Sequence, residues 1–237
     1  MLSNNAVLIE VKEITKNIKE FTVQLDEESE PFKAGQYCVF GCNNEEGKMV
    51  ARPYSIASAP SKNIRKFYIV LVENGALTPN LFKLKAGDKV FVSPRCVGHM
   101  TYVDNLENSQ NIIFFATGTG IAPFHSILNE YEEVLNEKKI TLVQGTRFEE
   151  ELGYLNYFKE LEKKYPNFRY IPSITRQDWD GHKGRITSIL NEGLLDEELR
   201  QPSLKIMMCG SLAMTAEAVE ILKIKGVSQE NIIKEGY

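Results

Sequence analysis

The sequence lacks the features that mark membrane-spanning, secreted and metal-binding proteins. No apolar run approaches the roughly 20 residues that a membrane-spanning helix needs. Residues 1–10 carry no basic segment followed by an apolar core, as a signal peptide would. The four cysteines, Cys38, Cys42, Cys96 and Cys209, form no C-x-x-C pair, and the three histidines are scattered, so we predict no metal site. The expected compartment is the reducing cytoplasm.

An excess of positive charge is also missing. The chain holds 28 Lys and Arg against 32 Asp and Glu, a net charge of −4, which argues against nucleic acid as a partner. Its 237 residues are enough for one large domain or two ordinary ones. Hydrophobic residues make up 43% and charged residues 25%, which is typical of a soluble globular protein.

The first part of the chain has the pattern of a small antiparallel β-barrel. Short segments rich in Val, Ile, Phe and Thr alternate with turn signals. The predicted strands, some with their leading turns, are 6–14, 18–25, 32–40, 50–58, 66–73 and 85–92. About six short strands of this kind favour a barrel over an open sheet.

The pattern changes after a polar stretch at 104–110. Apolar strands at 112–116, 140–145, 168–174 and 204–209 alternate with amphipathic helices at 124–135 and 152–165, a short helix at 186–190 and a helix after residue 211. This alternation predicts a parallel sheet with helices on both faces. We therefore expect two domains, 1–103 and 104–237.

A glycine turn joins the first of these strands to its helix. Thr117-Gly118-Thr119-Gly120 lets backbone N–H groups crowd together without Cβ clashes, and the helix that follows directs its positive dipole end to the same place. Such a turn suits a pyrophosphate. It lacks the G-x-G-x-x-G spacing, so an ordinary strand-to-helix turn is the alternative.

A second candidate motif, Arg52-Pro53-Tyr54-Ser55, lies on a predicted barrel strand. Arginine can hold a phosphate with its planar fork. A tyrosine two residues on faces the same side and can lie against a flat ring, and the serine adds a hydroxyl. An edge strand with mixed side chains is the alternative.

Three motifs in sequence order resemble the ferredoxin–NADP⁺ reductase superfamily. They are R-P-Y-S at 52–55, G-T-G-I-A-P at 118–123 and C-G-S-L-A-M at 209–214. The chain is most similar to the bacterial ferredoxin/flavodoxin–NADP⁺ reductases, whose second flavin segment F-Y-I-V at 67–70 and G-A-L-T-P-N-L at 75–81 resemble. The resemblance covers nearly the whole chain. It implies a barrel that binds FAD, a sheet domain that binds NADPH, and electron transfer to or from ferredoxin or flavodoxin after hydride transfer at flavin N5.

The resemblance also implies roles for single residues. The flavin contacts would be Arg52, Pro53, Tyr54, Ser55, Tyr68, Ile69, Val70, Leu77 and Thr78. The nucleotide contacts would be Thr117, Gly118, Thr119, Gly120 and Gly210. The catalytic group would be Ser55, Cys209, Glu235 and Tyr237. For Cys209, a small buried residue at a strand end is the alternative.

Three arginines favour NADPH over NADH. NADPH carries an additional 2′-phosphate, whose recognition needs positive charge just past a strand end. Arg147, Arg176 and Arg185 each follow a predicted strand or precede the next helix, and arginines in the matching segments of the bacterial reductases grip that phosphate and the pyrophosphate. Taken singly, each could be an ordinary surface residue.

The residues Glu235-Gly236-Tyr237 resemble the Glu-x-Tyr at the end of the family's chains. There the tyrosine ring stacks on the flavin where the nicotinamide must go. Bacterial relatives often carry further residues after this tyrosine, so a frayed end is the alternative.

Two other functions remain open from the sequence. One is a different enzyme of the superfamily, such as another NAD(P)H-dependent flavin reductase or the reductase component of an oxygenase. The other is a non-catalytic electron-relay subunit, which would carry a cysteine cluster for iron–sulfur that this sequence does not have. A monomer is expected.

Overall fold

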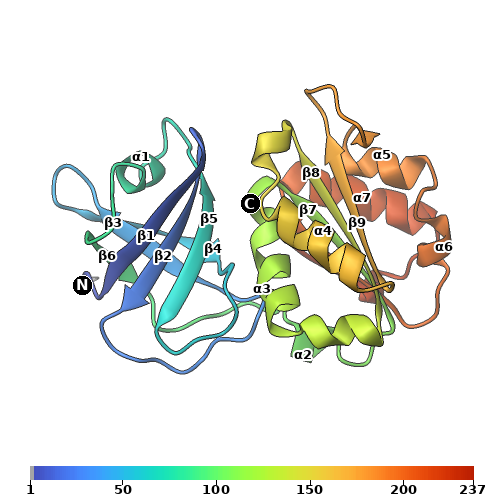
Figure 1. Cartoon of the computed structure of the whole chain (residues 1–237), viewed down its shortest axis with the longest axis horizontal. Coiled ribbons are helices and arrows are strands. Elements are labelled where there is room, and N and C mark those ends of the chain that lie inside the picture. The colour runs from blue at the N-terminus through green and yellow to red at the C-terminus, as the bar shows by residue number, and fades with distance from the viewer. Residues whose placement is uncertain (1–2) are drawn as a thin grey trace.

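Two six-stranded sheets lie side by side in the computed structural model, which describes residues 3–237 (Figure 1). The strands of the first sheet are β1 (Ala6–Thr15), β2 (Ile18–Leu25), β3 (Tyr37–Asn43), β4 (Met49–Ser55), β5 (Ile64–Val70) and β6 (Lys89–Val92). They are antiparallel and lie in the order β4-β3-β6-β1-β2-β5. The short helices α1 (Thr78–Leu81) and α2 (Tyr102–Asn105) accompany this part.

The first sheet curls around an aromatic core. Phe40 and Phe67, from strands far apart in the sheet, stack with ring centroids 4.6 Å apart. After β4 the chain turns toward the opposite edge strand, where the amide of Ala57 donates to the carbonyl of Lys66 at 2.8 Å. The predicted antiparallel barrel is confirmed.

The second sheet is wholly parallel among the described residues. Its strands are β7 (Asn111–Thr117), β8 (Lys139–Thr146), β9 (Phe168–Ile174), β10 (His182–Lys183), β11 (Leu204–Gly210) and β12 (Ile232–Gly236). They lie in the order β10-β9-β8-β7-β11-β12. The central strand β7 is apolar and buried from Ile112 to Ala116 because helices cover both of its faces.

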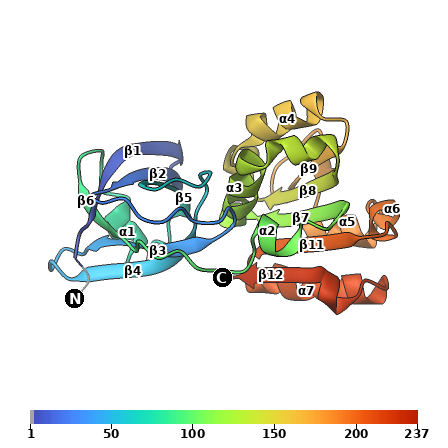
Figure 2. The same ribbon diagram turned by 90° about the horizontal axis from the view of Figure 1, so that it is seen from below.

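The helices divide between the two faces of this sheet, as Figure 2 shows. On one face lie α3 (Ala122–Glu130) and α4 (Leu155–Lys164), where Phe124 stacks on Phe114 and Phe158 belongs to the same core. The other face carries α5 (Ile186–Asn191) and α7 (Leu212–Ile224). The remaining short elements are η1 (Gly118–Ile121), η2 (Glu132–Asn136), η3 (Glu149–Glu151), α6 (Asp196–Leu199) and η4 (Gln229–Asn231). The predicted parallel α/β fold is confirmed.

Some element bounds differ from those predicted. The helix predicted over 124–135 ends at Glu130, because Tyr131 leaves helical geometry with φ −118° and ψ 39°. The two-residue strand β10 and the four-residue helices were not predicted, since elements this short show no periodicity. No helix among residues 3–237 is both long and apolar enough to cross a bilayer.

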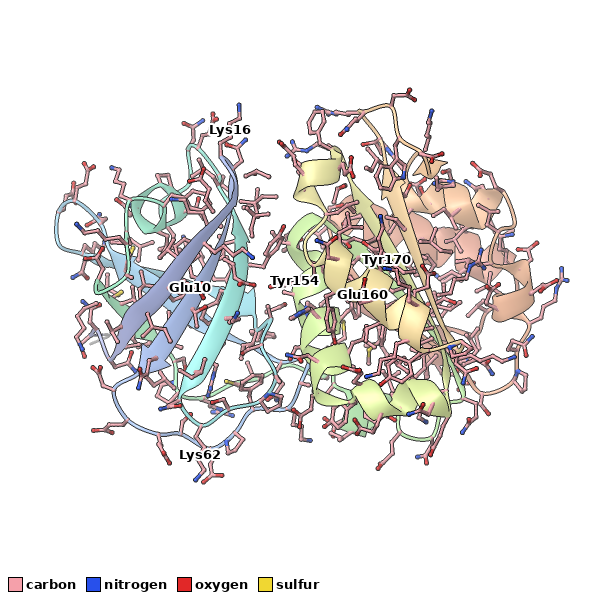
Figure 3. All side chains as sticks on the ribbon, viewed as in Figure 1. Glu10, Lys16, Lys62, Tyr154, Glu160 and Tyr170 are labelled. Atoms are coloured by element: carbon pink, nitrogen blue, oxygen red, sulfur yellow. The ribbon has the colours of Figure 1, made fainter. Side chains whose placement is uncertain are left out.

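The barrel and the α/β sheet share an interface. Ser126 on α3 donates to the carbonyl of Ser58 at 2.7 Å, and Tyr154 donates to the carboxylate of Glu20 on β2 at 2.5 Å. Tyr154 lies between the two sheets in Figure 3. The boundary predicted between residues 103 and 104 falls inside α2, whose Tyr102 stacks on Tyr131 with centroids 4.5 Å apart. It stays a prediction.

Candidate functional site

A cavity of about 690 Å³ opens where the parallel strands end. Its walls come from the residues that end or follow β7, β8, β9 and β11, and the barrel adds Ile18 and Val70. In open α/β sheets the ligand crevice lies outside the carboxyl ends of the strands. This cavity therefore occupies the expected place for a ligand.

The glycine turn lies at the centre of this edge. Gly118 has φ +53°, and Gly120 brings the turn so close to β11 that an added Cβ would lie 2.2 Å from the carbonyl oxygen of Cys209. Gly210 is equally constrained, since its Cβ would lie 2.0 Å from the Thr117 hydroxyl oxygen. That hydroxyl accepts a hydrogen bond from the amide of Ser211 at 3.2 Å. The glycines thus hold the ends of β7 and β11 together beneath the cavity.

All three predicted arginines line this one cavity. Arg147 is half exposed and pairs with Glu151 at 2.9 Å, and Arg185 is 80% exposed with Glu217 at 3.9 Å. Arg176 has no ion pair within residues 3–237, while its amide donates to the carbonyl of Arg147 at 2.9 Å. Three guanidinium groups around one cavity make a donor set suited to a ligand with several phosphates.

The barrel and the sheet bring three further predicted residues together. Cys209 on β11 and Glu235 on β12 are register partners, so both reach the same edge of the sheet. Ser55, at the end of β4, is the barrel residue near the Cys209 thiol. Burial, followed by the charge of Glu235, raises the pKa of Cys209 to about 12, against a lowering by Ser55. Cys209 is therefore a neutral thiol at physiological pH.

Glu235 is mostly enclosed, with 18% of its side chain exposed. Burial raises the pKa of its carboxyl above the ordinary value, and the nearby His99 opposes this. The Nδ1 atom of His99 lies 4.0 Å from Glu235 Oε1. Sequence reasoning did not assign His99 to the site, because a histidine in a loop after the barrel carries no motif of its own.

Tyr237 lies on the glycine turn. Its amide donates to the carbonyl of Gly210 at 3.1 Å, and its hydroxyl lies 2.9 Å from Thr119 Oγ1 and donates to the carbonyl of Thr117 at 3.1 Å. The residue lines the cavity and is 61% exposed. Figure 2 shows the chain ending between the two sheets. These contacts mean that the last residue is held in place and is not frayed.

The predicted flavin motif lies on β4, an edge strand of the barrel. Arg52 is exposed, and its guanidinium makes its one side-chain hydrogen bond within residues 3–237 to the neighbouring carbonyl of Ala51, at 2.8 Å. Tyr54 packs edge-on against Phe40 and Phe67, with centroids 6.2 and 6.5 Å apart. Burial raises the pKa of its phenol to about 12. A cation with spare donors, a fixed aromatic ring and the Ser55 hydroxyl thus follow one another along this strand, which fits a flavin with its phosphates.

Comparisons with known proteins agree with this geometry. A family model described as an oxidoreductase FAD-binding domain matches residues 5–102, and one described as an oxidoreductase NAD-binding domain matches residues 114–220. A flavodoxin/ferredoxin–NADP reductase of Buchnera aphidicola (subsp. Schizaphis graminum) is 32% identical over 96% of this chain and 93% of its own length. The chain belongs to the ferredoxin–NADP⁺ reductase family. A flavodoxin/ferredoxin–NADP reductase of Escherichia coli (strain K12) is also 32% identical, over 79% of this chain and 77% of its own.

Solved structures agree with membership of the ferredoxin–NADP⁺ reductase family. A ferredoxin NADP⁺ reductase from Neisseria gonorrhoeae, solved with bound FAD and NADP, superposes with a TM-score of 0.86 at 25% identity, covering 99% of this chain and 98% of that chain. A flavohemoglobin from Malassezia yamatoensis reaches the same TM-score at 18% identity and is covered over 60% of its length, which is a likeness of fold alone.

Five more residues were predicted to contact flavin from the ferredoxin–NADP⁺ reductase resemblance. Val70 lines the cavity. Ile69 and Leu77 are buried in the barrel core, and Thr78 exchanges hydrogen bonds with the backbone of Val72. The ring of Tyr68 is buried in the interface with the α/β sheet. Except for Val70, these side chains lie inside the protein, and their contribution to a flavin site stays a prediction.

The structure also adds cavity residues that the motif-based reading of a ferredoxin–NADP⁺ reductase missed. Thr146 ends β8 and Thr175 directly follows β9, and each precedes one of the predicted arginines. Ser211 follows Gly210 at the end of β11. The Ser211 hydroxyl caps α7 by accepting from the amide of Met214 at 3.3 Å. The signal that could have found them is small hydroxyl residues at the ends of successive parallel strands, all of which meet at one edge.

Proposed function

We propose that the protein is an FAD-dependent reductase that moves electrons between NADPH and ferredoxin or flavodoxin. The observation that carries this proposal is the convergence of three arginines, the glycine turn and the Ser55–Cys209–Glu235 group on one edge between the two sheets. FAD, when bound, supplies an acceptor for hydride at N5 and releases the two electrons singly to a carrier. The protein's own residues would bind the flavin and the nucleotide, orient them, and exclude water from the transfer site.

The nucleotide would be held by charge and by backbone donors. Arg176 and Arg185 line the cavity and would grip the 2′-phosphate that distinguishes NADPH from NADH. The turn from Thr117 to Gly120 would present its N–H groups and the positive end of the following helix to the pyrophosphate. Arg147 shares its charge with Glu151 and would contribute less.

The Cys209 thiol would stay uncharged at the transfer site. A buried thiol with a pKa of about 12 remains neutral and places no negative charge where a hydride must pass. The Ser55 hydroxyl holds the thiol from the barrel side, and Glu235 closes the site from β12. Together the three side chains would fix the distance between the nicotinamide and the flavin and would exclude water.

The flavin would be held by the barrel. The exposed guanidinium of Arg52 would take a phosphate, and the ring of Tyr54, fixed by its packing on Phe40 and Phe67, would lie against the flavin ring. These roles are supported by the side chains that β4 presents and by the resemblance to the family in both sequence and fold.

The proposal includes a one-electron carrier as partner and a monomer acting in the cytoplasm. Relatives named flavodoxin/ferredoxin–NADP reductase support the carrier. All four cysteines are unpaired, as is usual where thiols remain reduced. Size-exclusion chromatography with light scattering, expected to give the mass of one chain, tests the monomer.

The experiment is anaerobic reduction of the purified protein. The protein should be isolated with FAD at about one per chain, and NADPH should bleach the flavin absorbance much faster than the same concentration of NADH. Cys209→Ser should keep the FAD and slow the bleaching. A preparation that holds FMN or no flavin, or that NADPH fails to reduce, would overturn the proposal.

A further inference from the structure

Two cysteines outside the proposed active site lie beside a β-bridge between β3 and the loop that follows β6. Tyr37 and Val97 form a bridge in which each amide donates to the other's carbonyl at 2.9 Å. Cys38 follows Tyr37 and Cys96 precedes Val97, so this bridge brings the two cysteines to neighbouring positions. Disulfides form between residues whose Cα atoms are about 4.4–6.8 Å apart, a range that residues next to a β-bridge can meet.

The side chains also lie close together. Cys96 packs on the barrel core that contains Cys38, and each thiol shifts the pKa of the other, that of Cys38 upward and that of Cys96 downward. Cys38 is buried, whereas Cys96 is partly exposed and open to a small oxidant. The other two cysteines, Cys42 and Cys209, are both buried.

A buried cation acts on this pair. Arg65 on β5 is fully enclosed, donates to the carbonyls of Ser61 and Ile64 at 2.6 and 2.9 Å, and lies over the ring of Phe32. Its Nε–H is buried and makes no hydrogen bond within residues 3–237. The hydrogen bond from Cys38 and the charge of Arg65 lower the pKa of Cys96, against burial, which raises it. A thiolate at Cys96 would be the natural acceptor for this guanidinium.

We propose that Cys38 and Cys96 are a redox-active dithiol that peroxide converts into a reversible intramolecular disulfide. The Cys96 sulfur attacks one peroxide oxygen, the O–O bond breaks, and sulfenic acid and water form. The Cys38 sulfur then attacks the Cys96 sulfur, the S–S bond forms, and the hydroxyl leaves as water with the Cys38 proton. Two thiols are oxidised, one peroxide is reduced to two waters, and a small dithiol reductant reverses the change.

The position of the pair links it to the strand that carries the flavin motif. Cys38 on β3 is the register partner of Tyr54 on β4, and Tyr37 is the partner of Ser55. The disulfide would therefore fasten the strand directly beside the Arg52–Ser55 segment. The proposal does not depend on the reductase activity, since thiols are counted without NADPH or a carrier.

The test is a thiol count on the flavin-loaded protein. Unfolded after mild treatment with hydrogen peroxide, the protein should show two free thiols in place of four, and dithiothreitol should restore all four. Non-reducing peptide mapping should link Cys96 to Cys38. Because Lys33 and Lys48 bound one tryptic peptide that holds both Cys38 and Cys42, the mapping is done on Cys42→Ser.

Two variants and the wild type decide the outcome. Cys42→Ser should fall from three thiols to one, whereas Cys96→Ser should keep its three at the same peroxide dose. Four remaining thiols in the wild type would overturn the proposal, as would a Cys96 oxidised to sulfinic acid beside a free Cys38, or a disulfide between two chains. The wild-type count stands by itself if a variant fails to fold.

Discussion

The hydroxyl of Tyr237 lies 2.9 Å from the hydroxyl of Thr119 and donates to the carbonyl of Thr117 at 3.1 Å. The last residue of the chain is thereby bound to the same turn that we propose for the dinucleotide. Its ring also lines the cavity. A nicotinamide that docks beside Cys209 must therefore compete with this ring and break its contacts.

Removal of the Tyr237 ring should strengthen nucleotide binding. In Tyr237→Ser the nicotinamide would no longer have to displace the stack on the flavin that the family resemblance predicts for this ring. Such a stack is typically worth about 0.5–1.5 kcal/mol, so the Kd of NADP⁺ should fall by about two- to ten-fold. The preference for NADPH over NADH should weaken, because a freely docked nicotinamide depends less on the 2′-phosphate.

The variant Tyr237→Phe is the matched control for the hydroxyl. It keeps the ring and loses the contacts with Thr117 and Thr119, so its Kd should lie between those of the wild type and Tyr237→Ser. Difference absorption titrations measure the three constants. Three equal values would mean that the ring does not compete with the nucleotide.

Loss of two cavity arginines should remove the preference for NADPH. In the double variant Arg176→Ala/Arg185→Ala, charge-assisted hydrogen bonds typically worth about 1.5–3 kcal/mol are lost, so KM for NADPH should rise about ten- to hundred-fold. KM for NADH should change little. Arg200→Ala, an exposed arginine away from the cavity, is the control and should leave both constants as they are. Steady-state kinetics with both nucleotides would show an equal rise in both constants if these arginines do not read the 2′-phosphate.

Replacement of Arg52 should weaken flavin retention. Its guanidinium has donors to spare, and a charge-assisted contact with a phosphate is typically worth about 1.5–3 kcal/mol, so Arg52→Ala should bind FAD about ten- to hundred-fold more weakly. Flavin fluorescence on dilution measures the released fraction. Lys48→Ala, an exposed cation on the turn before β4, should retain FAD like the wild type. Equal retention by all three proteins would place the phosphate elsewhere.

The buried carboxyl of Glu235 should make stability depend on pH. Because its folded-state pKa is raised above 4.5, the unfolded chain loses this proton first, and the free energy of unfolding falls as pH rises from about 4.5 through the raised value. The variant Glu235→Gln has no carboxyl at this position and therefore lacks this pH-dependent fall in the free energy of unfolding. The Tm of the variant relative to the wild type should therefore increase between pH 4 and pH 7.

The control for this pH profile is Glu230→Gln, a change of an exposed carboxyl. Its Tm difference from the wild type should stay constant over the same range. A Tm difference for Glu235→Gln that is constant or shrinks with pH would mean that Glu235 is solvated in the folded protein, and that His99 at 4.0 Å does not share an enclosed site with it.

Most of the fold could be predicted from the spacing of apolar residues along the sequence. The apolar run that became β7 and the alternation after it predict a buried parallel strand between helices, because only strands covered on both faces are apolar throughout. Residue bounds shifted where the chain left regular geometry, as at Tyr131. Such endings depend on local packing that no repeat in the sequence records.

Candidate site residues that belong to a sequence motif could be predicted, whereas those that are brought together only by tertiary contacts could not. The arginines could be placed at one edge, because parallel strands end together. The approach of His99 to Glu235 required the barrel loop to reach the end of β12, and the nearness of Cys38 to Cys96 required the bridge between Tyr37 and Val97. Neither relationship has a signature in residue spacing.

Electron delivery to a carrier tests the proposed reductase function most directly. Flavin-loaded protein is mixed anaerobically with NADPH and either oxidised ferredoxin or oxidised flavodoxin in a stopped-flow instrument, and the carrier's own absorbance is followed. We expect that at least one carrier is reduced with multiple turnovers, faster with NADPH than with NADH, and more slowly by Cys209→Ser. Rapid flavin reduction with no reduction of either carrier would contradict it.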